Sequence, residues 1–148
     1  MTSFEDVLES GEPLVYRVKG RSMLPMLMEN RDIVIIEKPG SRLKKYDVAF
    51  FMSGDQYVLH RVIRVKKDHY ITRGDNNLVS EKAPEEAVIG VLTGFVQDGK
   101  RFSVDDEEYV SYYKKRLRRY PLRVVYRKLK LRGPYLRIKS LFSGKSES

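Results

Sequence analysis

Seven short runs of apolar and β-branched residues, separated by turn-forming residues, occupy most of the chain before Val104. Gly, Pro, Asn and Asp interrupt these runs too often for a long amphipathic helix to lie between them. The pattern therefore predicts a mainly β fold, a coiled antiparallel sheet or barrel. The expected strands are Leu14–Lys19, Asp32–Glu37, Asp47–Met52, Tyr57–Val65, His69–Arg73, Ala87–Gln97 and Arg101–Val104, with one short helical turn at Glu5–Glu9.

The periodicity changes to a helical one after Val104. Ser103 and Asp106 are typical of a helix N-terminus, and a first apolar stripe is formed by Tyr109, Val110, Tyr113 and Leu117. A second helix is expected from Pro121 to the Gly133-Pro134 stop, with a stripe of Leu122, Val125, Tyr126 and Leu129. We therefore expect a β domain over residues 1–104 and a basic amphipathic helical tail over residues 105–148.

The chain of 148 residues carries a net charge of +9, and the whole excess lies in this tail. Residues 1–111 hold 16 Lys/Arg and 19 Asp/Glu, whereas residues 112–148 hold 13 Lys/Arg and one acid, Glu147. Such asymmetry indicates an anionic partner. Three interpretations compete for residues 112–142: binding to an anionic membrane surface, binding to nucleic acid, and packing on the β domain. We rank nucleic acid below the other two.

Several kinds of protein are excluded or disfavoured by residues that the chain lacks. Without cysteine there is no disulfide scaffold and no thiol nucleophile, and two histidines disfavour a catalytic metal site. No turn has the spacing of a phosphate-binding loop, so no cofactor is expected. The sequence has no secretory signal, and its longest uncharged stretch is 11 residues, against about 20 for a membrane-spanning helix. We expect a cytoplasmic protein, peripheral on the inner membrane face if the tail binds lipid.

Three residues of the β region are of the types that nucleophilic hydrolysis requires. Ser22 follows one expected strand, His60 lies within another, and Asp75 follows a third. A serine hydroxyl is a weak nucleophile until an adjacent base takes its proton, and a third group orients that base. Each residue alone also fits a structural role, as a turn serine, a core histidine or a turn aspartate. Only their combination favours catalysis.

In this order the surrounding segments resemble the type I signal peptidase family. Ser22-Met23-Leu24-Pro25 resembles its nucleophile box, His60-Arg61-Val62-Ile63 its general-base box, and Gly74-Asp75-Asn76-Asn77 its Gly-Asp-Asn box. Arg31–Ile35 and Tyr46–Phe51 resemble its two Gly-Asp-apolar strand boxes, with Arg and Tyr in place of Gly. A histidine in the base position is similar to the endoplasmic-reticulum and archaeal branch, whereas most bacterial members use lysine. The resemblance covers roughly Tyr16 to Phe95.

The resemblance implies a signal-peptidase-like fold and a serine endopeptidase. Ser22 would be the nucleophile and its amide an oxyanion donor, His60 rather than His69 the general base, and Asp75 the group that orients His60 or stabilises its charged form. The histidine branch has a second aspartate after the Asn pair; here that role is vacant or falls to Glu81. The implied substrate is a leader- or signal-like segment of a peptide or protein, with small residues before the cut. Because the family's N-terminal membrane anchor is not found in this sequence, we expect a short, cytoplasmic relative.

Two other functions stay open at this stage. The first is a non-catalytic β domain whose basic helical arm binds an anionic membrane or nucleic acid. The second is a self-cleaving regulator that resembles the SOS-repressor relatives, which share a Ser-Met box and a related β fold. We rank the second last because that group uses a lysine base and lacks the Gly-Asp-Asn turn.

Overall fold

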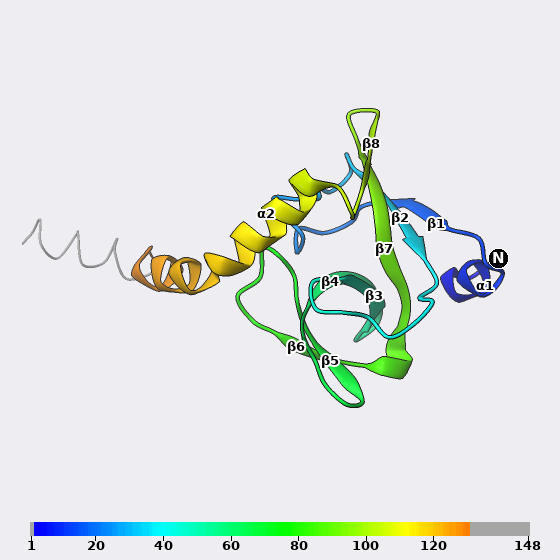
Figure 1. The fold of residues 1–148 in the computed structure, drawn as a ribbon, viewed down its shortest axis with the longest axis horizontal. Coiled ribbons are helices and arrows are strands. Elements are labelled where there is room, and N and C mark those ends of the chain that lie inside the picture. The colour runs from blue at the N-terminus through cyan, green and yellow to red at the C-terminus, as the bar shows by residue number, and fades with distance from the viewer. Residues whose placement is uncertain (1, 131–148) are drawn as a thin grey trace, which may run out of the picture. The chain divides into compact units, whose positions relative to one another are not determined.

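The computed structural model describes residues 2–130, which form a mainly β fold with C-terminal helices, as predicted (Figure 1). In this part of the chain eight strands join one antiparallel sheet, which curls into a half-barrel. The strand order is β1-β2-β7-β3-β4-β5-β6, and β8 pairs with β7 outside this path. The elements are α1 (Phe4–Glu9), β1 (Leu14–Arg17), β2 (Ile33–Glu37), β3 (Val48–Ser53), β4 (Gln56–Val65), β5 (His69–Arg73), β6 (Glu81–Pro84), the 3-10 turn η1 (Glu85–Ala87), β7 (Val88–Gln97), β8 (Lys100–Ser103) and α2 (Glu107–Arg118).

The long strand β7 pairs with three other strands of the sheet. One edge pairs with β2, and the other pairs first with β3 and then with β8. The register shifts once against β2 and once against β3, and each shift leaves an extra residue in β7, as in a bulge, which increases the local twist of a sheet. A side chain at Gly90 would place its Cβ 2.4 Å from Cγ2 of Ile36, so β7 needs a glycine where it packs this closely. The resulting curl brings the loop after β1 close to β4, although three strands separate them in the sheet.

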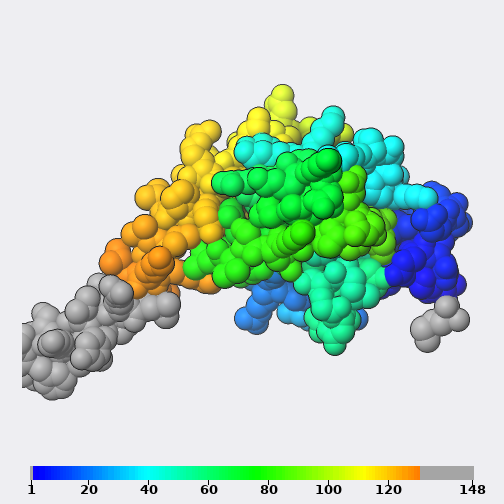
Figure 2. Space-filling view, turned by 90° about the horizontal axis from the view of Figure 1, so that it is seen from below, coloured from blue at the N-terminus to red at the C-terminus, as the bar shows by residue number. Residues whose placement is uncertain are grey.

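Alternate side chains of β3 are buried in two different apolar clusters. Val48 and Phe50 belong to the first cluster, and Ala49 and Phe51 belong to the second. Because neighbouring side chains of a strand point to opposite faces, a strand buried on both faces needs a continuous apolar run. The first cluster also includes Leu8 of α1, so this short helix packs at one end of the β unit, in dark blue in Figures 1 and 2.

All seven predicted strands are present, with small shifts at their ends, and the helical turn predicted at Glu5–Glu9 is α1. Its N-terminus has a capping box, in which Ser3 Oγ accepts a hydrogen bond from Asp6 N–H. Strand β6 was not predicted. Its sequence, Glu81-Lys82-Ala83-Pro84, has no apolar alternation and ends in proline. Proline is tolerated there because β6 pairs only with β5, at the end of the sheet order.

Helix α2 ends at Arg118, and residues 120–130 are helical again up to the end of the described part. The break precedes Pro121, which has no N–H to donate within a helix, as the sequence predicted. The chain divides into two compact units, Met1–Tyr113 and a second that begins at Lys114. The domain boundary expected after residue 104 stays a prediction. The predicted Gly133-Pro134 stop and the tail beyond it lie outside the described residues. None of the helices in residues 2–130 combines the length and hydrophobicity that crossing a bilayer requires.

Candidate active site

Ser22 and His60, the predicted nucleophile and base, line the same pocket of the β unit. Ser22 comes from the loop after β1, and His60 comes from β4. The pocket has a volume of about 680 Å³, which is within the range of small-molecule and peptide-binding clefts. The structure therefore brings the two predicted residues to one cavity.

One wall of this pocket is aromatic. It contains Phe4, Tyr16 and Tyr57. The Phe4 ring stacks on Tyr16 at 5.7 Å between centroids and meets Tyr57 edge-on at 5.3 Å. Burial raises the pKa of Tyr16 to about 12, so its hydroxyl stays protonated at neutral pH and adds no negative charge to the pocket. This wall can bind apolar parts of a ligand next to Ser22 and His60.

The backbone of Ser22 is held by the turn that follows β5. The Asn76 N–H donates a 2.8 Å hydrogen bond to the Ser22 carbonyl oxygen. A Cβ at Gly74 would lie 2.5 Å from that same oxygen, so only glycine allows this approach. Within its own loop, Leu27 N–H donates to the Met23 carbonyl oxygen at 3.0 Å. The Gly-Asp-Asn turn predicted from the sequence therefore braces the Ser22 loop through its backbone.

His60 is held in place on β4 by a carboxylate from β6. Its ring is 8% exposed and meets Phe51 edge-on at 6.0 Å between centroids. His60 Nδ1 is hydrogen-bonded to Oε1 of Glu81, and Ser53 Oγ donates to the other carboxylate oxygen of Glu81 at 2.8 Å. A carboxylate oxygen only accepts hydrogen bonds, so Nδ1 carries the proton and donates it, and in the neutral ring the lone pair is on Nε2. This is the tautomer that a general base needs.

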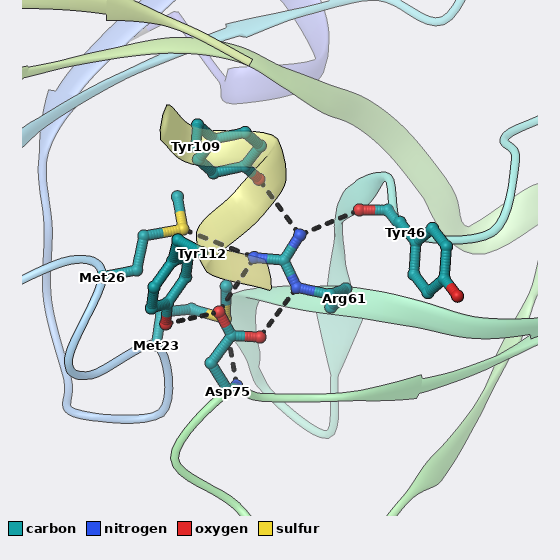
Figure 3. A network of polar contacts seen from close by, with 7 residues as sticks. All are labelled: Met23, Met26, Tyr46, Arg61, Asp75, Tyr109 and Tyr112. Carbon is teal, nitrogen blue, oxygen red and sulfur yellow. Dashed lines mark hydrogen bonds and ion pairs between the residues drawn. The ribbon is translucent and has the colours of Figure 1, made fainter. Parts of the chain in front are cut away.

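Asp75 has different partners from those that the sequence predicted. Its carboxylate accepts 2.8 Å hydrogen bonds from Nε and Nη2 of Arg61, and a 3.0 Å bond from the Tyr112 hydroxyl (Figure 3). The side chains of Arg61 and Asp75 are 0% and 1% exposed. Because neighbouring side chains of a strand point to opposite faces, Arg61 and His60 diverge. The carboxylate that contacts His60 is that of Glu81, and Asp75 neutralises a buried arginine.

The first turns of α2 complete the surroundings of Arg61. The Arg61 Nη1 donates to the Tyr109 hydroxyl at 3.1 Å and to the Tyr46 carbonyl oxygen at 2.9 Å. The guanidinium also lies over the Tyr113 ring, 4.9 Å from its centroid (Figure 3 shows the network without this ring). Burial alone would lower the pKa of Arg61, but the Asp75 charge holds it above the usual value. The Arg61 guanidinium therefore stays charged at neutral pH.

Within residues 2–130, the structure gives Ser22 Oγ no hydrogen bond to His60. Catalytic hydrogen bonds are often long in the absence of substrate, so this spacing is compatible with a dyad that closes on binding. No group of three or more His, Asp or Glu side chains in the described chain is placed to hold a metal ion.

Comparison with known families identifies the family of the β unit that contains this pocket. The model of the Peptidase S24-like family matches residues 3–93, a span that includes Ser22, His60, Asp75 and Glu81. The chain belongs to the Peptidase S24-like family. The match ends within β7, so α2 and the residues after it lie outside the matched span. No curated protein matches the chain. The narrower prediction of a histidine-using signal peptidase branch stays a prediction.

Two residues of this site were not assigned from the sequence as the structure places them. The sequence indicated Glu81 only as a substitute for a missing aspartate, because no strand was predicted at Glu81–Pro84 to place it beside His60. Arg61 was noted only as the neighbour of His60. A signal was present for Arg61: an arginine in the middle of an apolar strand must be paired when buried, and Asp75 was a candidate partner.

Proposed function

We propose that this member of the Peptidase S24-like family is a serine endopeptidase with Ser22 as nucleophile and His60 as general base. The observation that carries the proposal is that Ser22 and a Glu81-bound His60 share one pocket, although they come from distant parts of the chain. The histidine base supports a relationship to the endoplasmic-reticulum and archaeal signal peptidase branch, which the boxes around Ser22 and His60 resemble.

In the proposed reaction, His60 Nε2 removes the Ser22 hydroxyl proton as Oγ attacks the carbonyl carbon of the substrate. The Ser22 amide donates to the oxyanion that forms. Protonated His60 then gives its proton to the leaving amine, and an ester on Ser22 remains. Water, activated by the same imidazole, hydrolyses the ester. Glu81 keeps Nδ1 protonated throughout and stabilises the positive charge on the ring.

The proposed substrate is a leader- or signal-like segment of a peptide or protein. A peptide bound in an extended conformation alternates its side chains, so every second residue faces the same wall. The aromatic wall beside Ser22 favours apolar residues, and the resemblance to signal peptidases favours small residues at the first and third positions before the cut. A peptide library varied at these positions tests both preferences.

Labelling by a fluorophosphonate tests the nucleophile without knowledge of the substrate. We expect the probe to modify the natural chain at Ser22, and we expect no labelling of Ser22→Ala. Ser41→Ala is the matched control, because Ser41 is exposed and lies outside the pocket. Cleavage of the peptide library, measured by mass spectrometry, should likewise be retained in Ser41→Ala and lost in Ser22→Ala. Equal cleavage by Ser22→Ala and the natural chain would remove the proposal.

Cleavage of the chain by itself is a second candidate, which the Peptidase S24-like match favours because self-cleaving repressor relatives share the Ser-Met box. Incubation of the protein alone separates the two candidates. Intramolecular cleavage would give a pair of fragments whose formation requires Ser22. Its first-order rate constant would not change with protein concentration. A stable chain that cuts added peptides would indicate the endopeptidase.

A further inference from the structure

Four large apolar side chains are exposed on one face of the helical residues 120–130. They occupy positions i, i+3, i+4 and i+7, and a helix places such positions on a single stripe about 100° wide. Their exposed fractions are 70%, 54%, 64% and 60%, in the order Leu122, Val125, Tyr126 and Leu129. We call these four residues the apolar face.

Positive charge surrounds the apolar face. Residues 114–130 contain nine Lys/Arg and no acidic residue. At 100° per residue, Arg127 is on the side of the helix opposite the apolar face, and Lys128 and Lys130 are at its two flanks. The segment is therefore a helix with an apolar stripe and a cationic remainder, and its own sequence contains no carboxylate.

The apolar face differs from the other exposed apolar residues of the described chain. Those on the β unit, such as Val15, Met52 and Val79, come from separate elements and are normal for a protein surface. A continuous apolar stripe marks a surface that binds something. Its partner must offer an apolar region to the stripe and negative charge to the flanks.

We propose that the apolar face and its basic flanks bind the surface of a lipid bilayer that contains anionic headgroups. Such a surface provides both an apolar and an anionic contact. The stripe enters the boundary between headgroups and acyl chains, and the Lys and Arg side chains remain among the phosphates. Tyr126 adds a ring with a polar tip, which suits this boundary. Nucleic acid would account for the charge but not for Leu122, Val125 and Leu129, which have no base to contact in a phosphate-bound helix.

Co-sedimentation of the full chain with vesicles tests this surface. We expect it to bind phosphatidylcholine vesicles that contain about 30% phosphatidylglycerol more tightly than phosphatidylcholine alone. About 0.5 M salt should weaken this binding, because it shortens the Debye length, and should leave a residual part from the apolar stripe. A duplex DNA of random sequence, tested in the same buffer, is the competing ligand.

Two variants separate the apolar and the charged contributions. The double variant Leu122→Gln/Leu129→Gln keeps the net charge and should lower vesicle partitioning at least about tenfold. Arg127→Gln/Lys128→Gln should lower it about fivefold for each charge removed, and only on anionic vesicles. The matched control is Val79→Gln, which removes an exposed apolar side chain of the β unit and should bind like the natural chain.

Two results would overturn the proposal. Tight binding to duplex DNA that Leu122→Gln/Leu129→Gln does not weaken, with no vesicle binding, would assign the segment to nucleic acid. Absence of vesicle binding together with a lower unfolding midpoint of the same variant would show that the stripe packs on the protein itself. Neither result depends on peptidase activity, so the proposed function is tested separately.

Discussion

Two neighbouring residues of β4 illustrate how differently a fold can use charge. His60 faces a pocket and has a hydrogen-bonded carboxylate on one ring nitrogen only, so its other nitrogen can take up a proton. Arg61 faces the interior and has its donors bonded to Asp75, Tyr109 and the Tyr46 carbonyl. The first arrangement is suited to proton transfer, and the second to holding structure. Substitutions of their two carboxylate partners should therefore affect different measurable quantities.

For Glu81→Gln we predict a loss of activity without a loss of fold. The amide can donate to Nδ1 as well as accept from it, so it no longer fixes the tautomer or stabilises the imidazolium. We expect kcat to fall by at least about 10²-fold, since an orienting carboxylate can be worth about 10⁴-fold in a serine–histidine site. Steady-state kinetics on a cleaved peptide gives kcat and KM separately. Ser53→Ala removes one hydrogen-bond donor to Glu81 and should lower kcat less than Glu81→Gln does. An unchanged kcat in Glu81→Gln would exclude a role of Glu81 in orienting His60.

For Asp75→Asn we predict the opposite outcome, a large loss of stability. It leaves a fully buried arginine without its counter-charge, and breaking one partner of such a pair costs about 3–5 kcal/mol. Chemical denaturation with urea measures the change in the free energy of unfolding. Asp55→Asn, at an exposed turn, is the matched control. A variant that unfolds at the same urea concentration as the natural chain would contradict the structural role of Asp75.

At the residue scale, the sequence singled out Ser22 and His60, which line one pocket, but it did not indicate which of two carboxylates contacts His60. Asp75 and Glu81 both follow β5, and the order of boxes favoured Asp75. What decides between them is the direction of each side chain. That direction depends on β6, whose polar sequence carries no period-two signal. Because this strand was not predicted, nothing in the sequence placed Glu81 rather than Asp75 beside His60.

Among the elements, the loop that carries Ser22 is joined to the sheet at a buried aspartate just before β2. Asp32 accepts hydrogen bonds from Met28 N–H at 2.7 Å and from Gln97 Nε2 at 3.1 Å, and Arg31 Nε donates to its other oxygen at 2.7 Å. One side chain thus connects the end of the loop with the end of β7. Burial acts to raise the pKa of Asp32, but these hydrogen bonds outweigh it, so the pKa lies below its usual value.

A pKa lowered in the folded state has a defined effect on stability. The ionised Asp32 contributes fully above the pKa of the unfolded chain, about 3.9, and its contribution disappears as the pH falls through the lower folded value. We predict that Asp32→Asn is less stable than the natural chain at pH 7 and that this difference shrinks in acid. Urea denaturation at pH 7 and near pH 3 measures it. A difference that stayed constant across this range would contradict the pKa direction.

Helix α2 is attached to the β unit through its tyrosines, and these can be tested one hydroxyl at a time. Tyr112→Phe removes the donor to the Asp75 carboxylate, which should cost about 1.5–3 kcal/mol for a hydrogen bond to a charged group. Tyr113→Phe should be nearly neutral, because the ring that contacts Arg61 remains and no hydrogen bond of the Tyr113 hydroxyl is present in the described chain. Thermal unfolding of the two variants provides the comparison. Equal shifts in both would mean that the hydroxyl bond is not what attaches α2.

The sequence predicted the bounds of the strands closely wherever an apolar run is bounded by turn residues. Strands such as β3 and β7 are long apolar runs bounded by turns, and their limits were predicted nearly to the residue. The sheet order was not predicted, because the pairing of β7 with β2, β3 and β8 depends on bulges and on close packing at Gly90. Contacts between segments far apart in sequence leave little trace in a local pattern.

On the scale of the whole molecule, the charge and the chemistry are divided between the two units. The unit Met1–Tyr113 contains the pocket, the Arg61–Asp75 pair and the tyrosines that contact it. Among the described residues, none from Lys114 onward lines this pocket. The proposed peptidase site and the proposed membrane-binding helix can therefore be tested separately.

A chain that ends at Arg118, the last residue of α2, makes this separation. It retains the Tyr109, Tyr112 and Tyr113 contacts with the β unit, so we predict an unfolding midpoint and a fluorophosphonate labelling rate close to those of the full chain. Because it lacks Leu122, Val125, Tyr126 and Leu129, it should lose binding to anionic vesicles. Denaturation, labelling and co-sedimentation of the same preparation give the three values. If the shortened chain were folded but not labelled, the helical segment would be required for catalysis, and the two units would have to be treated as one functional site.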